Sequence, residues 1–166
     1  MVRLFFWACL FAPGLFAAGQ RTHVEMARGA IEHLVEMDPF LPGIQEFFAA
    51  PEVRDAFFCG SMFPDYGYQG IDEDRAEHSH WRAFQEAYLE HLLGRVGLPW
   101  DRSERRRIAF FLGVVCHGIT DIPWHFSERS FLAACRREEG AGHATVEVGC
   151  DFLLHRRGPL PVEFFW

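Results

Sequence analysis

Apolar side chains recur every three to four positions along most of this chain, which is the pattern of amphipathic helices. A first helix is predicted over Thr22–Met37, with apolar positions at Val24, Ala27, Ile31, Leu34 and Val35. Thr22 and Glu25 form a capping-box pattern at its start, and Asp38-Pro39 ends it.

The same spacing predicts five more helical regions, separated by residues that favour turns. They are Ile44–Phe58 with an interruption near Pro51, Glu77–Leu93, Arg105–Thr120 capped by Ser103, Glu128–Arg137 and His143–His155. The segment Cys59–Asp74 is rich in Gly, Pro and Asp and is predicted to be a loop. No stretch of any length alternates apolar and polar residues as a strand would. The pattern therefore predicts an all-α fold, a compact bundle of several helices.

The segment FFLGVVCHGITDIPWHF, residues 110–126, places three metal-ligand side chains inside an apolar run. His117, Asp121 and His125 are four residues apart, so they project from roughly one helix face. Burying them without a metal would require a partner for every polar group, so the trio indicates a metal site. His117 and His125 lie about 12 Å apart along the axis, too far to share one tetrahedral ion easily. Asp121 is therefore expected to bridge two ions, and Pro123 to kink or end the helix.

Further ligands must come from other segments, because one helix cannot complete two sites. His143 and Glu147 repeat the four-residue spacing, and His23, Asp65 and His80 lie at the starts of helices or in a loop. Imidazoles mixed with carboxylates are typical of zinc, and we expect them to line a cleft between helices. The candidate ligands are His23, Asp65, His80, His117, Asp121, His125, His143 and Glu147.

The N-terminus carries the features of an export signal. Arg3 precedes an apolar run over Leu4–Phe16, and Ala17-Ala18-Gly19 provides small residues for cleavage. This predicts a signal peptide over 1–19 and a secreted or periplasmic protein. The run is too short for a comfortable transmembrane helix. Four cysteines follow it and allow two disulfides, buried thiols or metal thiolates: Cys59, Cys116, Cys135 and Cys150.

Length and charge narrow the classes of function. The 166 residues suit one domain, predicted over 20–166. The net charge of −7 argues against nucleic acid as a broad electrostatic partner. A phosphate-containing substrate stays compatible with that charge, because bound metal cations would reverse the local field.

Five segments, in the same order, resemble the zinc-dependent phospholipase C family, most closely the N-terminal catalytic domain of glycosylphosphatidylinositol-specific phospholipase D. They are THVEMARGAIEHL, MFPDYGY, HSHWRAF, LPWDRSERRRIAFFLGVVCHGITDIPWHF and GHATVEVGCDF, and they cover most of Thr22 to Phe152. The resemblance implies an all-helical fold with three zinc ions in a cleft. One ion would be surrounded by Asp65, His80, His117 and Asp121, a second would be held by His23 with Asp121, and the third by His125, His143 and Glu147.

The resemblance also implies an activity. The protein would be an exported phosphodiesterase that cleaves phospholipid head groups or glycosylphosphatidylinositol with a metal-bound hydroxide, with transient contact to a membrane surface. Asp65 would act as both ligand and catalytic base. Two alternatives stay open: a single-strand-specific zinc nuclease, which uses a similar trinuclear site, and a truncated non-catalytic relative, because the chain stops at Trp166 where relatives continue.

Overall fold

The computed structural model describes residues 19–36, 43–68, 71–127, 133, 143–156 and 158, without the side chains of Val35, His143 and Ala144. The described part is helical and contains no strand, which confirms the predicted all-α fold for these residues. The elements are α2 (Gln20–Glu36), α3 (Ile44–Phe47), α4 (Pro51–Met62), the 3-10 helix η1 (Pro64–Tyr68), α5 (Glu73–Ser79), α6 (Arg82–Leu93), α7 (Arg102–Phe126) and α9 (His143–His155).

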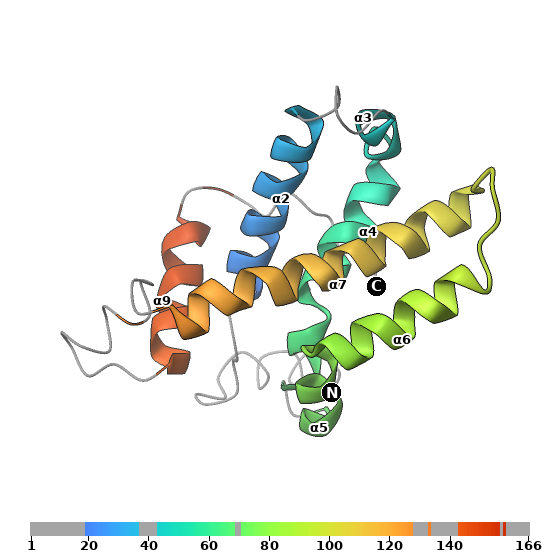
Figure 1. Ribbon diagram of the computed structural model, residues 1–166. Helices are drawn as coiled ribbons and strands as arrows, with labels where there is room; N and C mark the ends of the chain where they lie inside the picture. The colour runs from blue at the N-terminus through green and yellow to red at the C-terminus, as the bar shows by residue number, and fades with distance from the viewer. Residues whose placement is uncertain are drawn as a thin grey trace, which may run out of the picture.

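The long helix α7 runs through the middle of the bundle and crosses α2 and α4 (Figure 1). α6 packs along α7, and α9 packs against α2. The main apolar core lies between α2, α3, α4 and α7, and it is built around Val24, Ala27, Phe48, Val53, Phe57 and Ala109. Of these, Val24 and Ala27 occupy positions of α2 that the helical spacing predicted to be apolar, as does Ile31 of the same core.

Two glycines allow α4 and α7 to cross in backbone contact. A Cβ on Gly60 would collide with the carbonyl oxygen of Phe110, and a Cβ on Gly113 with that of Phe57. Neither neighbour could yield, because both are backbone atoms. This close crossing carries the carbonyl of Ser61 to within 2.8 Å of the His117 ring, and so it sets the position of the functional site.

The start and end of α7 differ from the sequence prediction. The N-cap is Asp101, not Ser103: its carboxylate accepts the N–H of Glu104 at 2.8 Å, and the Glu104 carboxylate accepts the N–H of Asp101 at 2.8 Å. This reciprocal pair is a complete capping box. The helix also runs past Thr120 and through Pro123 to Phe126. Near a helix end a proline removes one hydrogen bond without ending the helix, so the predicted end at Thr120 was wrong, whereas the alternative prediction of a kink at Pro123 stays a prediction.

The region 59–81 is more helical than predicted. Residues 59–62 complete α4, Pro64–Tyr68 forms η1, and α5 begins at Glu73, where the Asp72 carboxylate accepts the N–H of Arg75 at 3.1 Å. The predicted loop over Cys59–Asp74 was therefore wrong in part. The predicted single helix Glu77–Leu93 is divided at His80 and Trp81 into α5 and α6.

Two predictions fall outside the described residues. These are the export signal, of which only Gly19 is described, and the helix Glu128–Arg137, of which only Ala133 is described.

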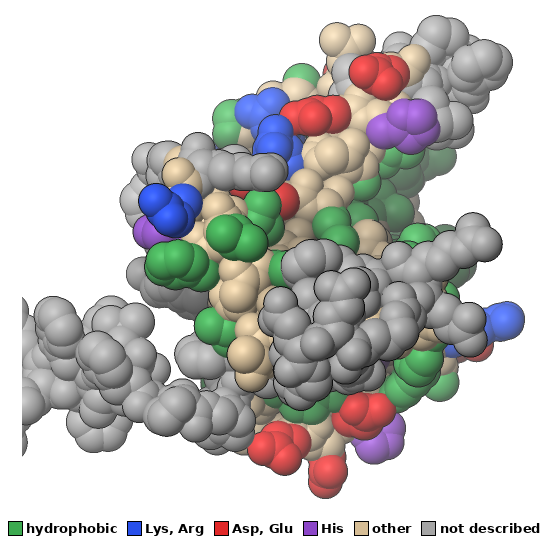
Figure 2. All heavy atoms as spheres, turned by 90° about the vertical axis from the view of Figure 1, so that its left-hand side faces the viewer, with side chains coloured by type: hydrophobic (Ala, Val, Ile, Leu, Met, Phe, Trp, Pro, Cys, Tyr) green, Lys and Arg blue, Asp and Glu red, His purple; other side chains and the backbone are tan. Residues whose placement is uncertain are grey.

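Among the described helices, α7 has the length and apolar composition to span a bilayer, but core helices of soluble proteins share these properties. Figure 2 views the molecule from the α9 side, where exposed apolar side chains gather; on α9 itself these are Val148, Phe152 and Leu153.

Candidate metal centre

One face of α7 carries the three side chains that the four-residue spacing predicted to lie on the same side of a helix. Asp121 lies between two imidazoles: its Oδ2 is 3.1 Å from His117 Nε2, and its Oδ1 is 3.4 Å from His125 Nε2. His117 and Asp121 are buried, and His125 is partly exposed. Each carboxylate oxygen thus faces a different histidine.

The first turns of α2 bring His23 onto the same carboxylate. His23 Nε2 is 3.5 Å from Asp121 Oδ1 and 3.4 Å from Asp65 Oδ2. Its ring stacks on that of His117 with centroids 3.9 Å apart. Two imidazoles from different helices therefore meet two carboxylates inside the bundle.

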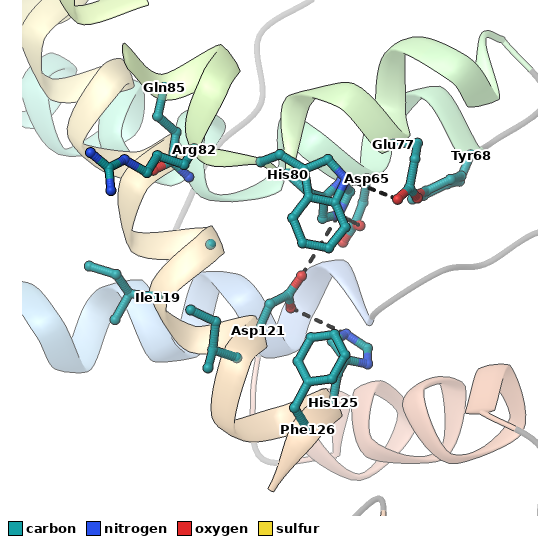
Figure 3. Close-up of a pocket in the computed structure, with 13 residues that line it drawn as sticks. Asp65, Tyr68, Glu77, His80, Arg82, Gln85, Ile119, Asp121, His125 and Phe126 are labelled. Carbon is teal, nitrogen blue, oxygen red and sulfur yellow. Dashed lines mark hydrogen bonds and ion pairs between the residues drawn. The ribbon is translucent and has the colours of Figure 1, made fainter.

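Asp65 on η1 and His80 at the end of α5 close the cluster (Figure 3). His80 Nε2 lies 3.1 Å from Asp65 Oδ1 and 3.8 Å from Asp121 Oδ2. His117 Nε2 lies 3.9 Å from Asp65 Oδ1. The structure thus brings together six of the eight predicted ligands, drawn from α2, η1, α5 and α7.

Backbone carbonyls fix the tautomers of two of these histidines. His80 Nδ1 is 2.7 Å from the carbonyl oxygen of Ala76, and His117 Nδ1 is 2.8 Å from that of Ser61. A carbonyl oxygen can only accept, so Nδ1 must carry the proton in both rings. In each neutral ring the Nε2 lone pair is then directed at the carboxylates, which is the arrangement of metal-binding histidines.

The residues fit a metal ion by their buried polar atoms. His117 Nε2, Asp65 Oδ2 and Asp121 Oδ1 are buried and have no hydrogen-bond partner among the described residues. Lone pairs that face one another in a buried space need a cation between them. Two sets of ligand atoms each lie within 4.8 Å of one another: His23, Asp65 and His117, and His80, His117 and Asp121. Imidazole nitrogen with carboxylate oxygen is a donor set that suits zinc.

Burial and mutual contact shift the pKa values of the cluster residues in different directions. Burial, reinforced by the neighbouring His117, lowers the pKa of His23 to about 3, so its ring is neutral at physiological pH. Burial raises the pKa of Asp65 above the ordinary carboxyl value. Burial acts the same way on Asp121, but its close contacts with the His117 and His125 rings outweigh it and hold the pKa of Asp121 below its usual range.

Pairing with carboxylates favours the protonated form of the other two rings, His80 and His125. Burial lowers the pKa of His80 and of His125, but pairing with Asp65 and Asp121 outweighs it and raises both values. A metal cation would take the place of these protons.

The predicted third group is only partly within the described residues. Glu147 on α9 is buried; its Oε1 is 3.9 Å from His125 Nε2 and accepts the indole N–H of Trp124 at 3.3 Å. The side chain of His143 lies outside the described part of the chain. A site formed by His125, His143 and Glu147 therefore stays a prediction.

Asp151 on α9 has a role that the sequence did not reveal. Its carboxylate accepts the N–H groups of Arg21 at 3.1 Å and Thr22 at 2.8 Å, and the Thr22 hydroxyl at 2.8 Å. It therefore caps the start of α2 immediately before His23. The predicted capping by Thr22 was wrong, since α2 begins at Gln20 and the Thr22 hydroxyl donates to Asp151. The signal available in the sequence was the four-residue spacing from Glu147 to Asp151, which places both on one face of α9.

Three cysteines lie within the described residues, Cys59, Cys116 and Cys150, and the first two are free thiols. No disulfide joins any two of these three, and Cys135 lies outside the described residues. Cys116 packs against the apolar core, and burial raises the pKa of its thiol. Its environment is that of a structural thiol.

An open pocket of about 650 Å³ gives access to the cluster (Figure 3). Asp65, His80, Asp121 and His125 line it together with apolar side chains of α7 and with the aromatic rings of Tyr68 and Trp81. Its size is ordinary for a small-molecule site.

Comparison with known proteins identifies the family. A model described as zinc dependent phospholipase C matches residues 22–163. The chain is similar to phosphatidylinositol-glycan-specific phospholipase D of Mus musculus, 31% identical over 70% of this chain and 14% of the relative. It is also similar to the proteins of that name from Homo sapiens, at 30% over 87% of this chain and 19% of the relative, and from Dictyostelium discoideum, at 36% over 82% and 15%.

The chain thus spans between about a seventh and a fifth of the length of these relatives. No solved structure matches it. The family match extends over most of the chain and includes every segment that contributes to the cluster. This chain belongs to the zinc-dependent phospholipase C family.

Proposed function

We propose that this protein is a zinc-dependent hydrolase that cleaves phosphodiester bonds of phospholipid head groups or of glycosylphosphatidylinositol. One observation carries the proposal: imidazoles and carboxylates from four elements converge with buried, unsatisfied lone pairs at the base of an open pocket. Membership of the family supports the same chemistry.

Zinc would be held by the groups that already converge. His23, Asp65 and His117 form one donor set and His80, His117 and Asp121 another; we propose His125, His143 and Glu147 as a third, which would give three ions. Bound zinc supplies positive charge that stabilises the phosphoryl oxygens in the transition state and makes water more acidic.

Asp65 is the residue we propose as general base. It is buried yet lines the pocket, and burial raises its pKa, so it accepts a proton more readily than an ordinary aspartate. The carbonyl of Ala76 holds His80, and His80 in turn lies against Asp65. These contacts keep the carboxylate at the pocket surface, where it can take the proton of the attacking water.

The rim of the pocket suits a lipid. Ile119, Ile122 and Phe126 lie on the outer side of α7 with relative exposures of 63%, 62% and 71%, and all three line the pocket. A diester whose polar head enters the pocket would place its acyl chains against this rim, and a transient contact with a membrane surface follows. The apolar N-terminal segment supports export, so we propose a secreted or periplasmic protein.

The test is to assay the full chain, loaded with zinc and with metal quantified, on phosphatidylcholine, phosphatidylinositol and single-stranded DNA. The expected result is lipid hydrolysis that His117→Ala abolishes and that His33→Ala, an exposed histidine of α2 outside the cluster, leaves unchanged. Released phosphocholine would indicate type C cleavage and released choline type D. Full activity in metal-stripped protein would refute the proposal, and cleavage of DNA alone would replace it with a nuclease.

A further inference from the structure

The turn between α6 and α7, residues 94–101, holds apolar side chains in solvent. Leu98 and Leu93 have relative exposures of 82% and 70%, and Leu89, one turn before Leu93 on α6, has 41%. Figure 1 shows this turn at the end of the α6–α7 pair that points away from α9. The pocket is lined by the start of α6 and the end of α7, so the exposed leucines form a separate patch.

Contacts with the core and with α7 hold this turn in place. The Trp100 ring meets Phe47 of the core edge-on, with ring centroids 6.0 Å apart. One carboxylate oxygen of Glu104 accepts the N–H of Gly97 at 3.2 Å, while the other completes the capping box of α7. Leu98 lies between these two fixed points, and it therefore faces solvent from a braced backbone.

Arginines flank the apolar tip on both sides. The segment 95–107, RVGLPWDRSERRR, contains five of the 16 basic residues of the chain against two acids, although the whole chain carries a net charge of −7. Arg102 pairs with Glu52 at 2.7 Å. The other four form no ion pair with any acid among the described residues: Arg95, Arg105, Arg106 and Arg107. Positive charge is thus concentrated here in an acidic protein.

The stability of the fold does not account for these side chains. Four of the five arginines lie within the first six residues of α7, near the positive end of the helix dipole, where a cation does not stabilise the helix. Leu98 and Leu93 remain mostly in water and so contribute little to the core. Exposed apolar residues rimmed by polar ones mark a contact surface.

We propose that the α6–α7 turn docks the protein on an anionic phospholipid bilayer. Leu93 and Leu98 enter the boundary between head groups and acyl chains, and Trp100 lies at the head-group level, which indole rings favour. The flanking arginines extend to the lipid phosphates and acidic head groups.

Charge complementarity favours a bilayer over a protein partner. Unpaired arginines on both sides of an apolar tip match a surface that is anionic outside and apolar within. The net charge of −7 does not prevent this contact, because attraction at such a surface acts within about one Debye length, roughly 10 Å. The local charge of the turn therefore decides the interaction.

This docking goes beyond the function proposed above and is independent of it. About 20 Å of the α7 axis separates Arg106 from Ile119 at the pocket rim. Binding through the turn can therefore be measured without turnover and altered without touching the pocket.

The test measures co-sedimentation of the zinc-loaded full chain with two kinds of vesicle, phosphatidylcholine alone and an equal mixture with phosphatidylglycerol. Wild type is expected to bind the anionic vesicles about tenfold more tightly and to be released by high salt. The double substitution of Arg106→Gln with Arg107→Gln should lower the partition coefficient on anionic vesicles about tenfold, and Leu98→Gln should lower it about fivefold.

Two control variants remove similar groups elsewhere. Arg28→Gln with Arg75→Gln takes two exposed arginines from α2 and α5, and Ile71→Gln takes an exposed isoleucine just before α5. Both should partition as wild type does. Equal binding of wild type to the two kinds of vesicle, or equal losses in the turn variants and the controls, overturns the proposal. Absence of binding to either vesicle also overturns it and leaves the turn to a protein partner.

Hydrolysis of dihexanoyl phosphatidylcholine below its micellar concentration separates docking from catalysis. All these variants should hydrolyse this dissolved lipid at the wild-type rate. A loss of this activity in the turn variants would show that the turn acts on the pocket, and the docking role would be abandoned. Wild type that binds anionic vesicles through the turn but hydrolyses no lipid would refute the proposed function and leave the docking intact.

Discussion

Asp151 holds the start of α2, and with it His23, through contacts that cross from α9. Two backbone N–H groups and one hydroxyl donate to its carboxylate, within 2.8–3.1 Å. These N–H groups belong to the first turn of a helix, where no intrahelical acceptor exists. A negative charge at this end also interacts favourably with the helix dipole. We therefore expect Asp151→Ala to destabilise the fold and to loosen His23.

The size of the effect follows from these contacts. Loss of a helix cap costs about 1 kcal/mol, and loss of the carboxylate near the helix N-terminus about 0.5 kcal/mol more. The Thr22 hydroxyl loses its acceptor as well, at about 1 kcal/mol. The total is about 2–3 kcal/mol, which corresponds to a fall in Tm of about 6–10 °C for a domain of this size. Asp151→Asn keeps an acceptor oxygen and should lose roughly half as much.

Thermal denaturation measures the first effect and zinc titration the second. The Kd for zinc should rise in Asp151→Ala, because His23 follows Thr22 directly and moves with the first turn of α2. Glu90→Ala, which removes an exposed acid from α6, provides the control and should change neither quantity. A Tm of Asp151→Ala within 1 °C of wild type, with unchanged zinc affinity, would refute the role assigned to Asp151.

Two further predictions concern the helix crossing and the buried histidine. Gly113→Ala should destabilise the fold by about 3 kcal/mol in urea denaturation, because the new Cβ meets backbone atoms of α4. Gly29→Ala, whose new Cβ would have no atom within 4 Å, should instead stabilise α2 by about 0.5–1 kcal/mol. Equal effects of the two substitutions would contradict the close crossing of α4 and α7. In metal-free protein, the stability of wild type relative to His23→Gln should decrease as the pH falls from 6.5 toward about 3, because the unfolded chain takes up a proton that the buried ring refuses. If the stability of wild type relative to His23→Gln increased toward low pH instead, His23 would have to be protonated in the folded protein.

The helical spacing of the sequence predicted the features of the fold that depend on local sequence, namely which side chains share a helix face. The apolar positions Val24, Ala27, Ile31 and Leu34 of α2 follow from the period of the helix alone, as does the alignment of His117, Asp121 and His125, and the structure contains both. The helical boundaries over residues 59–81 could not be read in this way. Gly60 reads as a helix breaker, but in the structure it serves the contact with Phe110, which lies on another helix.

Long-range partners account for what the sequence missed. Asp151 is about 130 residues from the groups that it caps, and no local pattern indicates that pairing. The pairing of Glu77 with Tyr68 similarly depends on the packing of η1 against α5. The resemblance of ordered segments predicted the candidate ligands, whereas the groups that support and flank them emerge from the tertiary structure.

The position of Asp121 has a consequence for metal content. Its Oδ2 faces His117 and its Oδ1 faces both His125 and His23, so ions held at the two oxygens would share this one carboxylate. Asp121→Asn should therefore release more than one zinc ion per chain, whereas His125→Gln should release no more than one. Metal analysis after dialysis against a fixed free zinc concentration measures both, with His33→Gln as the control. Equal losses from Asp121→Asn and His125→Gln would mean that Asp121 serves a single ion, and the bridging role would have to be abandoned.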